Sequence, residues 1–278
     1  MAKKRAASSS AYAKNKKLNR NILALASILA VVFIAIFILS PTKSRNIEKS
    51  DFYLQEGKAF FEKNETGKAI EAFEKAVKIN PKNEEAYNYL GLSHYKNNDF
   101  HNAVKAYKIS LNIDPDNAEI HRYLGYSYYR IKEFNNAIKE FEKALQINPN
   151  DDLAYNGIGL SYKWLANHEK SIDYYEKSLE INPDNPLVYK YIGAAYFNLR
   201  DWNNSIKYYI IAVEMNPDDY IALNGLGASY GNSGNYEKSL EYNKKALLLN
   251  PDYKSAKQNA RILESWGEKR QPDEQANA

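Results

Sequence analysis

The chain has 278 residues, of which 44% are hydrophobic and 26% are charged, so it can bury a sizeable core and is not disordered in bulk. Its 24 tyrosines stand beside only 9 prolines and 12 glycines, which excludes collagen-like, proline-rich and glycine-rich chains. The absence of cysteine excludes disulfide bonds, thiolate metal sites and cysteine nucleophiles.

The net charge of +4 is unevenly distributed along the chain. Residues 1–20 carry seven basic and no acidic side chains, whereas the chain from Asp51 onward carries 28 basic and 33 acidic ones. A nucleic-acid-binding domain needs its positive charge on the folded body. We therefore expect a disordered, basic tail over residues 1–20 and no nucleic-acid partner.

An uncharged segment follows this tail. Ile22–Leu39 contains a single polar residue, Ser27, and would be roughly 27 Å long as a helix, close to the ~30 Å hydrocarbon core of a bilayer. A cleaved secretory signal also begins with a basic region, but its apolar part is about 7–15 residues long and a small-residue cleavage site follows it, which is missing here. We expect an uncleaved signal-anchor, a single-pass transmembrane helix over residues 21–40, and a linker over 41–49.

Basic residues flanking this segment predict its orientation. Seven lie on its N-terminal side, and Lys43, Arg45 and Lys49 lie on the other. Because the more basic flank stays in the cytoplasm, the N-terminus is expected to be cytoplasmic and the rest extracytoplasmic, which in a bacterium is the periplasm.

The remaining chain repeats itself every 34 residues. An Asn-Pro or Asp-Pro pair recurs at this interval from Asn80 to Asn250, and a glycine recurs from Gly57 to Gly227. A repeat of this length is one supersecondary unit that stacks on its neighbours. The repeats are placed at 50–83, 84–117, 118–151, 152–185, 186–219 and 220–253, covering residues 50–253, and positions within a repeat are numbered below as places 1 to 34.

Each repeat is predicted to form two helices. The first has apolar or aromatic residues at places 4, 7 and 11 and the glycine at place 8, which share one helical face. The second has small residues at places 20 and 27 and an aromatic residue at place 24. Glycine inside a helix costs about 1 kcal/mol relative to alanine, so its recurrence predicts a close approach of the paired helix. Proline ends the second helix, and the Asn or Asp at place 34 is predicted to cap the next first helix.

This pattern resembles the tetratricopeptide repeat family over residues 50–253. The resemblance implies an all-α fold: a right-handed α-solenoid of six helix-turn-helix repeats, preceded here by the transmembrane helix, with a capping helix over 254–268 and a frayed tail over 269–278. Local departures are Glu56, His94, His121 and Asn243, which stand at places usually apolar or aromatic.

No motif for catalysis is present. The chain lacks Gly-x-Ser-x-Gly, a phosphate-binding glycine loop with lysine, and His-Glu-x-x-His. His94 and His121 occupy aromatic places, so we interpret them as polar substitutes within the core. The protein is therefore expected to be no enzyme, and to need no cofactor or metal.

The resemblance implies that a ligand would lie in a concave groove lined by places 2, 5, 6, 9, 12 and 13 of the first helices. Candidate partner-binding residues at these places are Asn88, Tyr89, Tyr95, Arg122, Tyr123, Tyr126, Tyr129, Arg130, Asn156, Lys163, Trp164, Lys190, Tyr191, Phe197 and Asn224. A shallower lining with room for a bulky group is predicted in the fifth and sixth repeats, where the groove places hold Ala194, Gly225, Ala228 and Gly231. Place 2 contains no lysine, so the carboxylate clamp that some family members use for chaperone tails is not expected.

Aromatic rings, amides and cations together suit a polypeptide. The leading hypothesis is a membrane-anchored scaffold that binds a protein or peptide, rather than a small molecule, in envelope assembly or secretion. Two alternatives stay open: a glycan or cell-wall binding module, since aromatic platforms and amides also suit sugars, and a scaffold that self-assembles through the ends of its solenoid.

Overall fold

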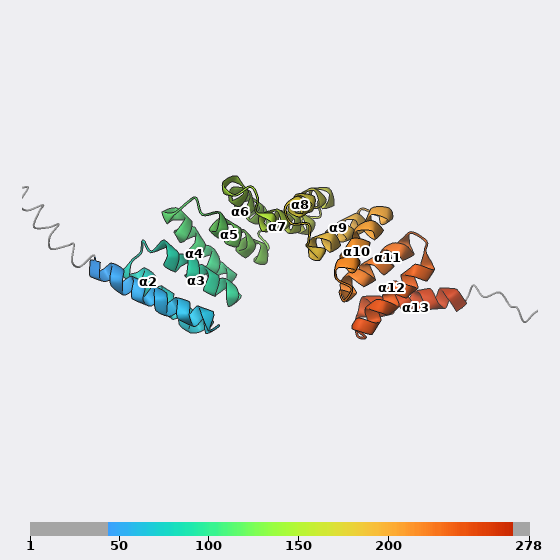
Figure 1. The fold of residues 1–278 in the computed structure, drawn as a ribbon, viewed down its shortest axis with the longest axis horizontal. Coiled ribbons are helices and arrows are strands. Elements are labelled where there is room, and N and C mark those ends of the chain that lie inside the picture. Colours follow the sequence, from blue (N-terminus) through green and yellow to red (C-terminus); the bar gives the residue numbers. More distant parts are fainter. Residues whose placement is uncertain (1–43, 269–278) are drawn as a thin grey trace, which may run out of the picture. The chain divides into compact units, whose positions relative to one another are not determined.

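The structure is a computed structural model that describes residues 44–268, with side chains described as far as residue 263. The chain divides between Leu90 and Gly91 into two compact units. The described part is entirely helical and contains no strand. The all-helical architecture expected from the sequence is therefore confirmed for these residues (Figure 1).

The first unit contains a helix over residues 44–62, then α2 (Thr66–Ile79) and the beginning of α3 (Glu84–Lys96). Its core is built around Phe73, which is completely buried. The first helix already includes residues 44–49, so this part of the expected linker is helical.

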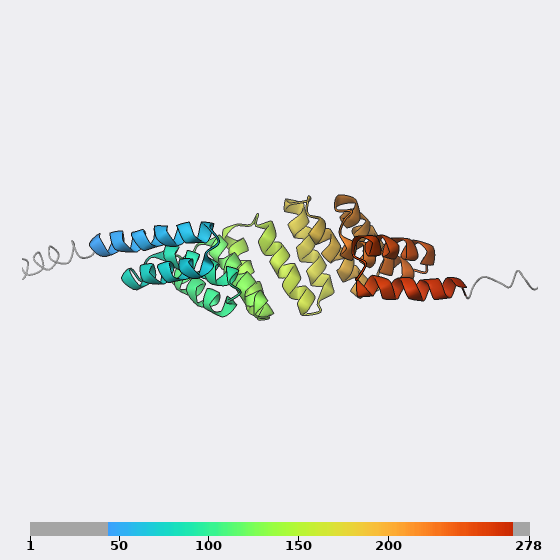
Figure 2. The same cartoon turned by 90° about the horizontal axis from the view of Figure 1, so that it is seen from below.

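The second unit continues as a series of helix pairs. They are α4 (Phe100–Ile113), α5 (Ala118–Arg130), α6 (Phe134–Ile147), α7 (Asp152–Trp164), α8 (His168–Ile181), α9 (Pro186–Asn198), α10 (Trp202–Met215), α11 (Tyr220–Asn232), α12 (Tyr236–Leu249) and α13 (Lys254–Glu268). From α4 to α13 each helix packs against the next one in sequence (Figures 1 and 2). The last helix, α13, spans the residues for which a capping helix is predicted.

Several predicted elements lie outside the described residues. These are the basic tail (1–20), the transmembrane segment (21–40) and the frayed tail (269–278). Among the helices of residues 44–268, none combines the length and the apolar character that a membrane span requires.

Capping side chains define where the first helices begin. Asn117 and Asp151 each accept a hydrogen bond from the backbone N–H three residues later, at 3.1 and 3.0 Å, as predicted. Asn185 differs, because its side chain makes no capping hydrogen bond and Pro186, whose φ is already helical, occupies the first turn. Equivalent caps on second helices were not predicted; they are Asp99, Asn167, Asp201 and Asn235.

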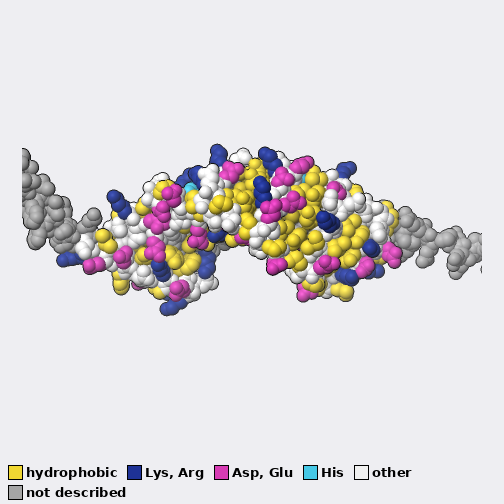
Figure 3. Space-filling model, turned by 45° about the horizontal axis from the view of Figure 1, so that its top comes forward, with side chains coloured by type: hydrophobic (Ala, Val, Ile, Leu, Met, Phe, Trp, Pro, Cys, Tyr) yellow, Lys and Arg dark blue, Asp and Glu magenta, His cyan; other side chains and the backbone are white. Residues whose placement is uncertain are grey.

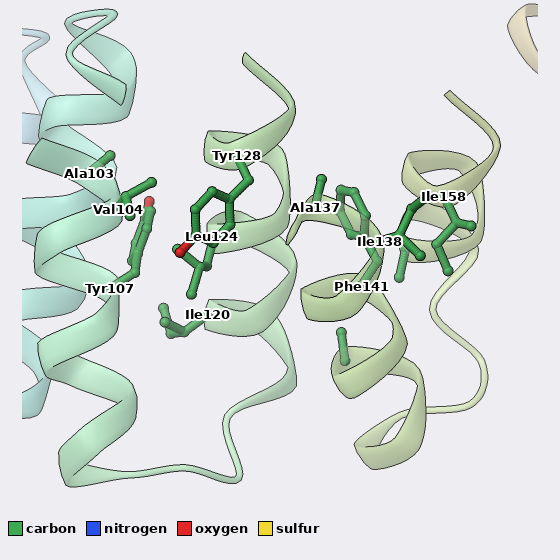
Figure 4. Close-up of a cluster of buried hydrophobic side chains, with 12 residues drawn as sticks. Ala103, Val104, Tyr107, Ile120, Leu124, Tyr128, Ala137, Ile138, Phe141 and Ile158 are labelled. Carbon is green, nitrogen blue, oxygen red and sulfur yellow. The ribbon is translucent and has the colours of Figure 1, made fainter. Parts of the chain in front are cut away.

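The ring at place 24 fills the space beside the glycine at place 8. A Cβ atom on Gly91 would lie 2.5 Å from the Tyr107 ring, and one on Gly159 would lie 2.5 Å from the Tyr175 ring. Such distances are well below a van der Waals contact, so the close approach predicted from the glycines is confirmed. Tyr107 belongs to the buried cluster shared by α4, α5, α6 and α7 (Figure 4).

His121 is buried, as its aromatic place predicts, and it is held by two acceptors. Its Nδ1 lies 2.7 Å from Glu140 Oε2 and its Nε2 lies 3.1 Å from the Pro115 carbonyl oxygen. Burial raises the pKa of Glu140, but hydrogen bonds from His121 and Lys143 outweigh it and bring the pKa below its usual value. Both ring nitrogens of His121 therefore face oxygen atoms that accept hydrogen bonds, so the buried ring is satisfied on both sides.

The glycine contacts predict opposite effects for two alanine substitutions. Gly159→Ala should destabilise the fold by about 1–3 kcal/mol, because the added methyl group overlaps the buried Tyr175 ring. Gly67→Ala in α2 has open space around the new methyl group and should stabilise the fold by about 0.5–1 kcal/mol. Thermal unfolding followed by circular dichroism tests both, and equal midpoints for the two variants would contradict the packing explanation.

Candidate functional site

The candidate site lies on the first helices of the second unit. Helix α5 contacts α7, and α11 contacts both α9 and α13. We call the surface that α5, α7, α9 and α11 present at places 2, 5, 6, 9, 12 and 13 the groove face. Asn88 and Tyr89 belong to the first unit and are described separately from it.

The tyrosines at place 6 pack against the preceding repeat. Tyr123 stacks on Tyr107 with ring centroids 6.1 Å apart, and Tyr191 stacks on Tyr175 at 5.6 Å. In the first unit Tyr89 stacks in the same way on Phe73, also at 5.6 Å. One face of each of these three candidate rings is therefore occupied by an inter-repeat contact.

Glycine replaces this tyrosine in the fourth and sixth repeats. A Cβ on Gly157 would lie 2.4 Å from the Phe141 ring, and one on Gly225 would lie 2.4 Å from the Tyr209 ring. The prediction that Gly225 leaves room for a bulky group is therefore wrong, because the preceding ring fills that room. By contrast, Ala228 and Gly231 do line a pocket of about 490 Å³ with residues of α12 and α13.

Two candidate cations at place 5 are paired within the protein. The Arg122 Nε lies 2.9 Å from Asp151 Oδ2, and the Lys190 Nζ lies 2.5 Å from Asp219 Oδ2. Asp151 and Asp219 are also the residues that cap α7 and α11. These pairs therefore join each first helix to the start of the next one.

The candidate amides are largely engaged or buried as well. Asn224 donates a hydrogen bond to Asn243 Oδ1 at 2.7 Å, and Asn88 donates to Glu84. Asn156 is buried on α7, and solvent does not reach its amide oxygen. The hydroxyl of Tyr126 donates to the Leu153 carbonyl oxygen at 2.8 Å.

Aromatic residues at place 12 pack at the turn inside each repeat. The three such candidates meet the first residue of the second helix edge to face: Tyr95 with Phe100 at 5.2 Å, Tyr129 with Phe134 at 5.8 Å, and Phe197 with Trp202 at 5.2 Å. The candidate Arg130 places its guanidinium 4.2 Å from the centre of the Phe100 ring.

An exposed aromatic site remains where the third and fourth repeats meet. Trp164 is 60% exposed, stacks on Phe134 with centroids 6.0 Å apart, and donates from Nε1 to the Tyr129 hydroxyl at 2.7 Å. Together with Arg130 and Lys132 these side chains line a pocket of about 150 Å³. We call it the Trp164 pocket.

Several residues of this face were not among the predicted partner-binding residues. Phe134 and Lys132 were overlooked because they follow the first helix and are not groove places. Place 2 of the last three repeats holds exposed aliphatic side chains, which are Leu153 (40% exposed), Leu187 (42%) and Ile221 (45%). The sequence does indicate this apolar surface, since place 2 changes from acidic residues in the first three repeats (Asp51, Glu85 and Glu119) to aliphatic residues in the last three.

Stacked tyrosines on other helix faces account for much of the tyrosine content. Tyr162 stacks on Tyr174 at 5.7 Å, and Tyr196 stacks on Tyr208 at 5.5 Å. Lysine ammonium groups lie over several of these rings. Figure 3 shows one face of the molecule, on which hydrophobic side chains gather over the C-terminal half of the second unit with charged groups among them.

The repeated helix pairs define the protein as a helical-repeat solenoid, and comparison with known families identifies the repeat. Models described as TPR repeat or tetratricopeptide repeat match residues 57–98, 90–152, 153–185 and 220–253. Together they cover more than half of the chain. The chain therefore belongs to the tetratricopeptide repeat family.

Solved structures with the same fold have low sequence identity to this chain. PilF of Pseudomonas aeruginosa superimposes with a TM-score of 0.65 at 19% identity, over 80% of this chain and 99% of its own. The protein MamA superimposes with a TM-score of 0.59 at 29% identity, over 62% of this chain and 93% of its own. YrrB, described as a TPR protein with an unusual peptide-binding site, superimposes with a TM-score of 0.59 at 22% identity, over 69% of this chain and 99% of its own. No curated protein matches the chain in sequence.

The ion pair of Arg122 predicts a structural effect. Arg122→Ala leaves the largely buried carboxylate of Asp151 without its cation and should destabilise the fold by about 2 kcal/mol, or several degrees in the thermal midpoint. The exposed Lys139→Ala on α6 is the control and should leave the midpoint unchanged. An unchanged midpoint for Arg122→Ala would instead favour a ligand-binding role for the guanidinium.

Proposed function

We propose that the protein is a non-enzymatic scaffold that binds an extended segment of a partner protein on the groove face of the second unit. The observation that carries this proposal is the Trp164 pocket, in which an indole that stacks on Phe134 with one face is still 60% exposed and lies beside two cations. Exposed aromatic anchors of this kind dominate the energetics of protein interfaces.

The exposed aliphatic side chains extend the binding surface across three first helices. Leu153 on α7, Leu187 on α9 and Ile221 on α11 hold the same place in consecutive repeats. Packed helices lie about 8–10 Å apart, and an extended chain advances about 3.3 Å per residue. A segment crossing the helices would therefore meet a new aliphatic side chain with about every third residue.

The glycan-binding alternative has less support from the groove face. A sugar platform needs open aromatic faces flanked by free amides, but Tyr123 and Tyr191 are stacked on other rings. The amides of Asn156 and Asn224 are buried. YrrB, which shares the fold, is described as having a peptide-binding site, so the fold is compatible with a peptide ligand.

We also propose that residues 21–40 anchor the protein in a membrane, with the N-terminus in the cytoplasm and the repeats on the other side. The uncharged run Ile22–Leu39 and the excess of basic residues before it support this topology. Envelope assembly or secretion is the setting that fits such a tethered scaffold.

Substitution of Trp164 tests the peptide-binding function. Nine-residue peptides selected by phage display on the purified full-length chain should bind Trp164→Ala at least about 30-fold more weakly, the cost of losing an anchor of ~2 kcal/mol. The control Leu248→Ala removes a side chain on α12 that is 83% exposed, and it should bind like wild type. Equal binding by all three proteins would place the site elsewhere, provided that their thermal midpoints agree.

Protease accessibility tests the topology. In cells stripped of any outer layer, protease added outside the cytoplasmic membrane should digest the repeats and leave residues 1–40 protected, because only the latter are shielded by the bilayer. Immunoblots against tags at the two ends report each part. A fully protected repeat domain would contradict the proposed orientation.

A further inference from the structure

Lys163 is a half-buried cation on the groove face. It lies at place 12 of the fourth repeat, next to Trp164 in α7. Its ammonium nitrogen is 5.0 Å from the centre of the Tyr191 ring on α9. Removing a charge from water is unfavourable unless another group compensates for it.

The other half-buried cations of the groove face have carboxylate partners within the protein. Arg122 is paired with Asp151 and Lys190 with Asp219. Among the described side chains no carboxylate lies within ion-pair distance of the Lys163 ammonium. Its compensation inside the protein is the face of the Tyr191 ring.

The charged neighbour of Lys163 on α9 is the cation Lys190. Burial lowers the pKa of Lys163, and the nearby Lys190 lowers it further. Asp219, the N-cap residue of α11, is already bonded to Lys190 and to the backbone amides of Ile221 and Ala222. The charge of Lys163 is therefore balanced by an aromatic ring face and by no carboxylate of the described residues.

The repeat pattern shows that Lys163 does not serve the packing role of its place. Tyr95, Tyr129 and Phe197 fill place 12 in other repeats and pack edge to face on an aromatic residue at place 17. In the fourth repeat place 17 is His168, so that aromatic pair is missing.

Building on the proposed peptide-binding function, we propose that Lys163 binds the side-chain carboxylate of an Asp or Glu within the bound segment, while a neighbouring residue of that segment occupies the Trp164 pocket. A single ammonium group matches the single charge of a carboxylate. An internal acidic residue fits better than a chain end, because the groove face continues past α7 onto both α5 and α9.

The test uses a matched pair of peptides and a matched pair of proteins. A peptide selected by phage display on the full-length chain is synthesised with both ends blocked, once with its acidic residue and once with Gln there. Titration calorimetry with wild type and Lys163→Met then measures the coupling between the two groups. We expect the Gln peptide to bind wild type about tenfold more weakly, and Lys163→Met to bind both peptides alike.

Controls separate this inference from the proposed function. Lys139→Met, on the exposed face of α6, should keep the preference for the acidic peptide. Equal binding of both peptides to wild type, with binding still lost in Trp164→Ala, would overturn the role of Lys163 and leave the peptide-binding function intact. Unchanged binding in Trp164→Ala would overturn the peptide-binding function itself.

Two further peptides test the choice of a side-chain carboxylate. A version with phosphoserine at the acidic position, or one ending there in a free carboxylate, should bind no more tightly than the blocked acidic peptide. Tighter binding of either by tenfold would overturn the proposal in favour of that ligand. If Lys163→Met does not fold, as judged by circular dichroism, Lys163→Gln takes its place in the same measurement.

Discussion

In the first five repeats a buried ring on the second helix joins the two helices of the repeat and also contacts the next repeat. Tyr107 lies against Gly91 of its own repeat and stacks on Tyr123 of the following one. In the fourth repeat place 6 holds Gly157 instead of a tyrosine, and the Phe141 ring of the preceding repeat occupies the space that a tyrosine side chain would need. Because one ring makes both contacts, its size fixes the spacing within a repeat and between repeats at once.

The last repeat shows what replaces the ring when it is absent. Asn243 stands at place 24, and its amide is bonded to Asn224, to the Ser239 carbonyl oxygen and, at 3.4 Å, to Asn259 of α13. A buried amide is stable in this position only because partners satisfy it. At place 24 the last repeat therefore uses polar contacts where the other repeats use a buried ring.

These packing demands restrict where a ligand can be recognised. Tyrosines at place 6 and cations at place 5 are used between repeats, so they contribute little free binding surface. The fourth repeat departs from the pattern at places 12 and 13, where Lys163 and Trp164 stand. One face of the Trp164 indole stacks on Phe134, and the Lys163 ammonium lies over the Tyr191 ring. The indole is nevertheless 60% exposed and Lys163 has no carboxylate partner among the described side chains, so both are available for a partner.

The sequence by itself determined the period, the helix pairs, the caps of most first helices and the close approach at place 8, because each depends on contacts within one repeat or on local backbone chemistry. It did not reveal that Arg122 pairs with Asp151, or that Tyr191 stacks on Tyr175, since both contacts join residues from different repeats. Only the tertiary structure decided which groove side chains are already used and which are left exposed. The reason is that the stacking of one repeat on the next, and not the place of a residue within its repeat, sets how much of its surface a neighbour covers.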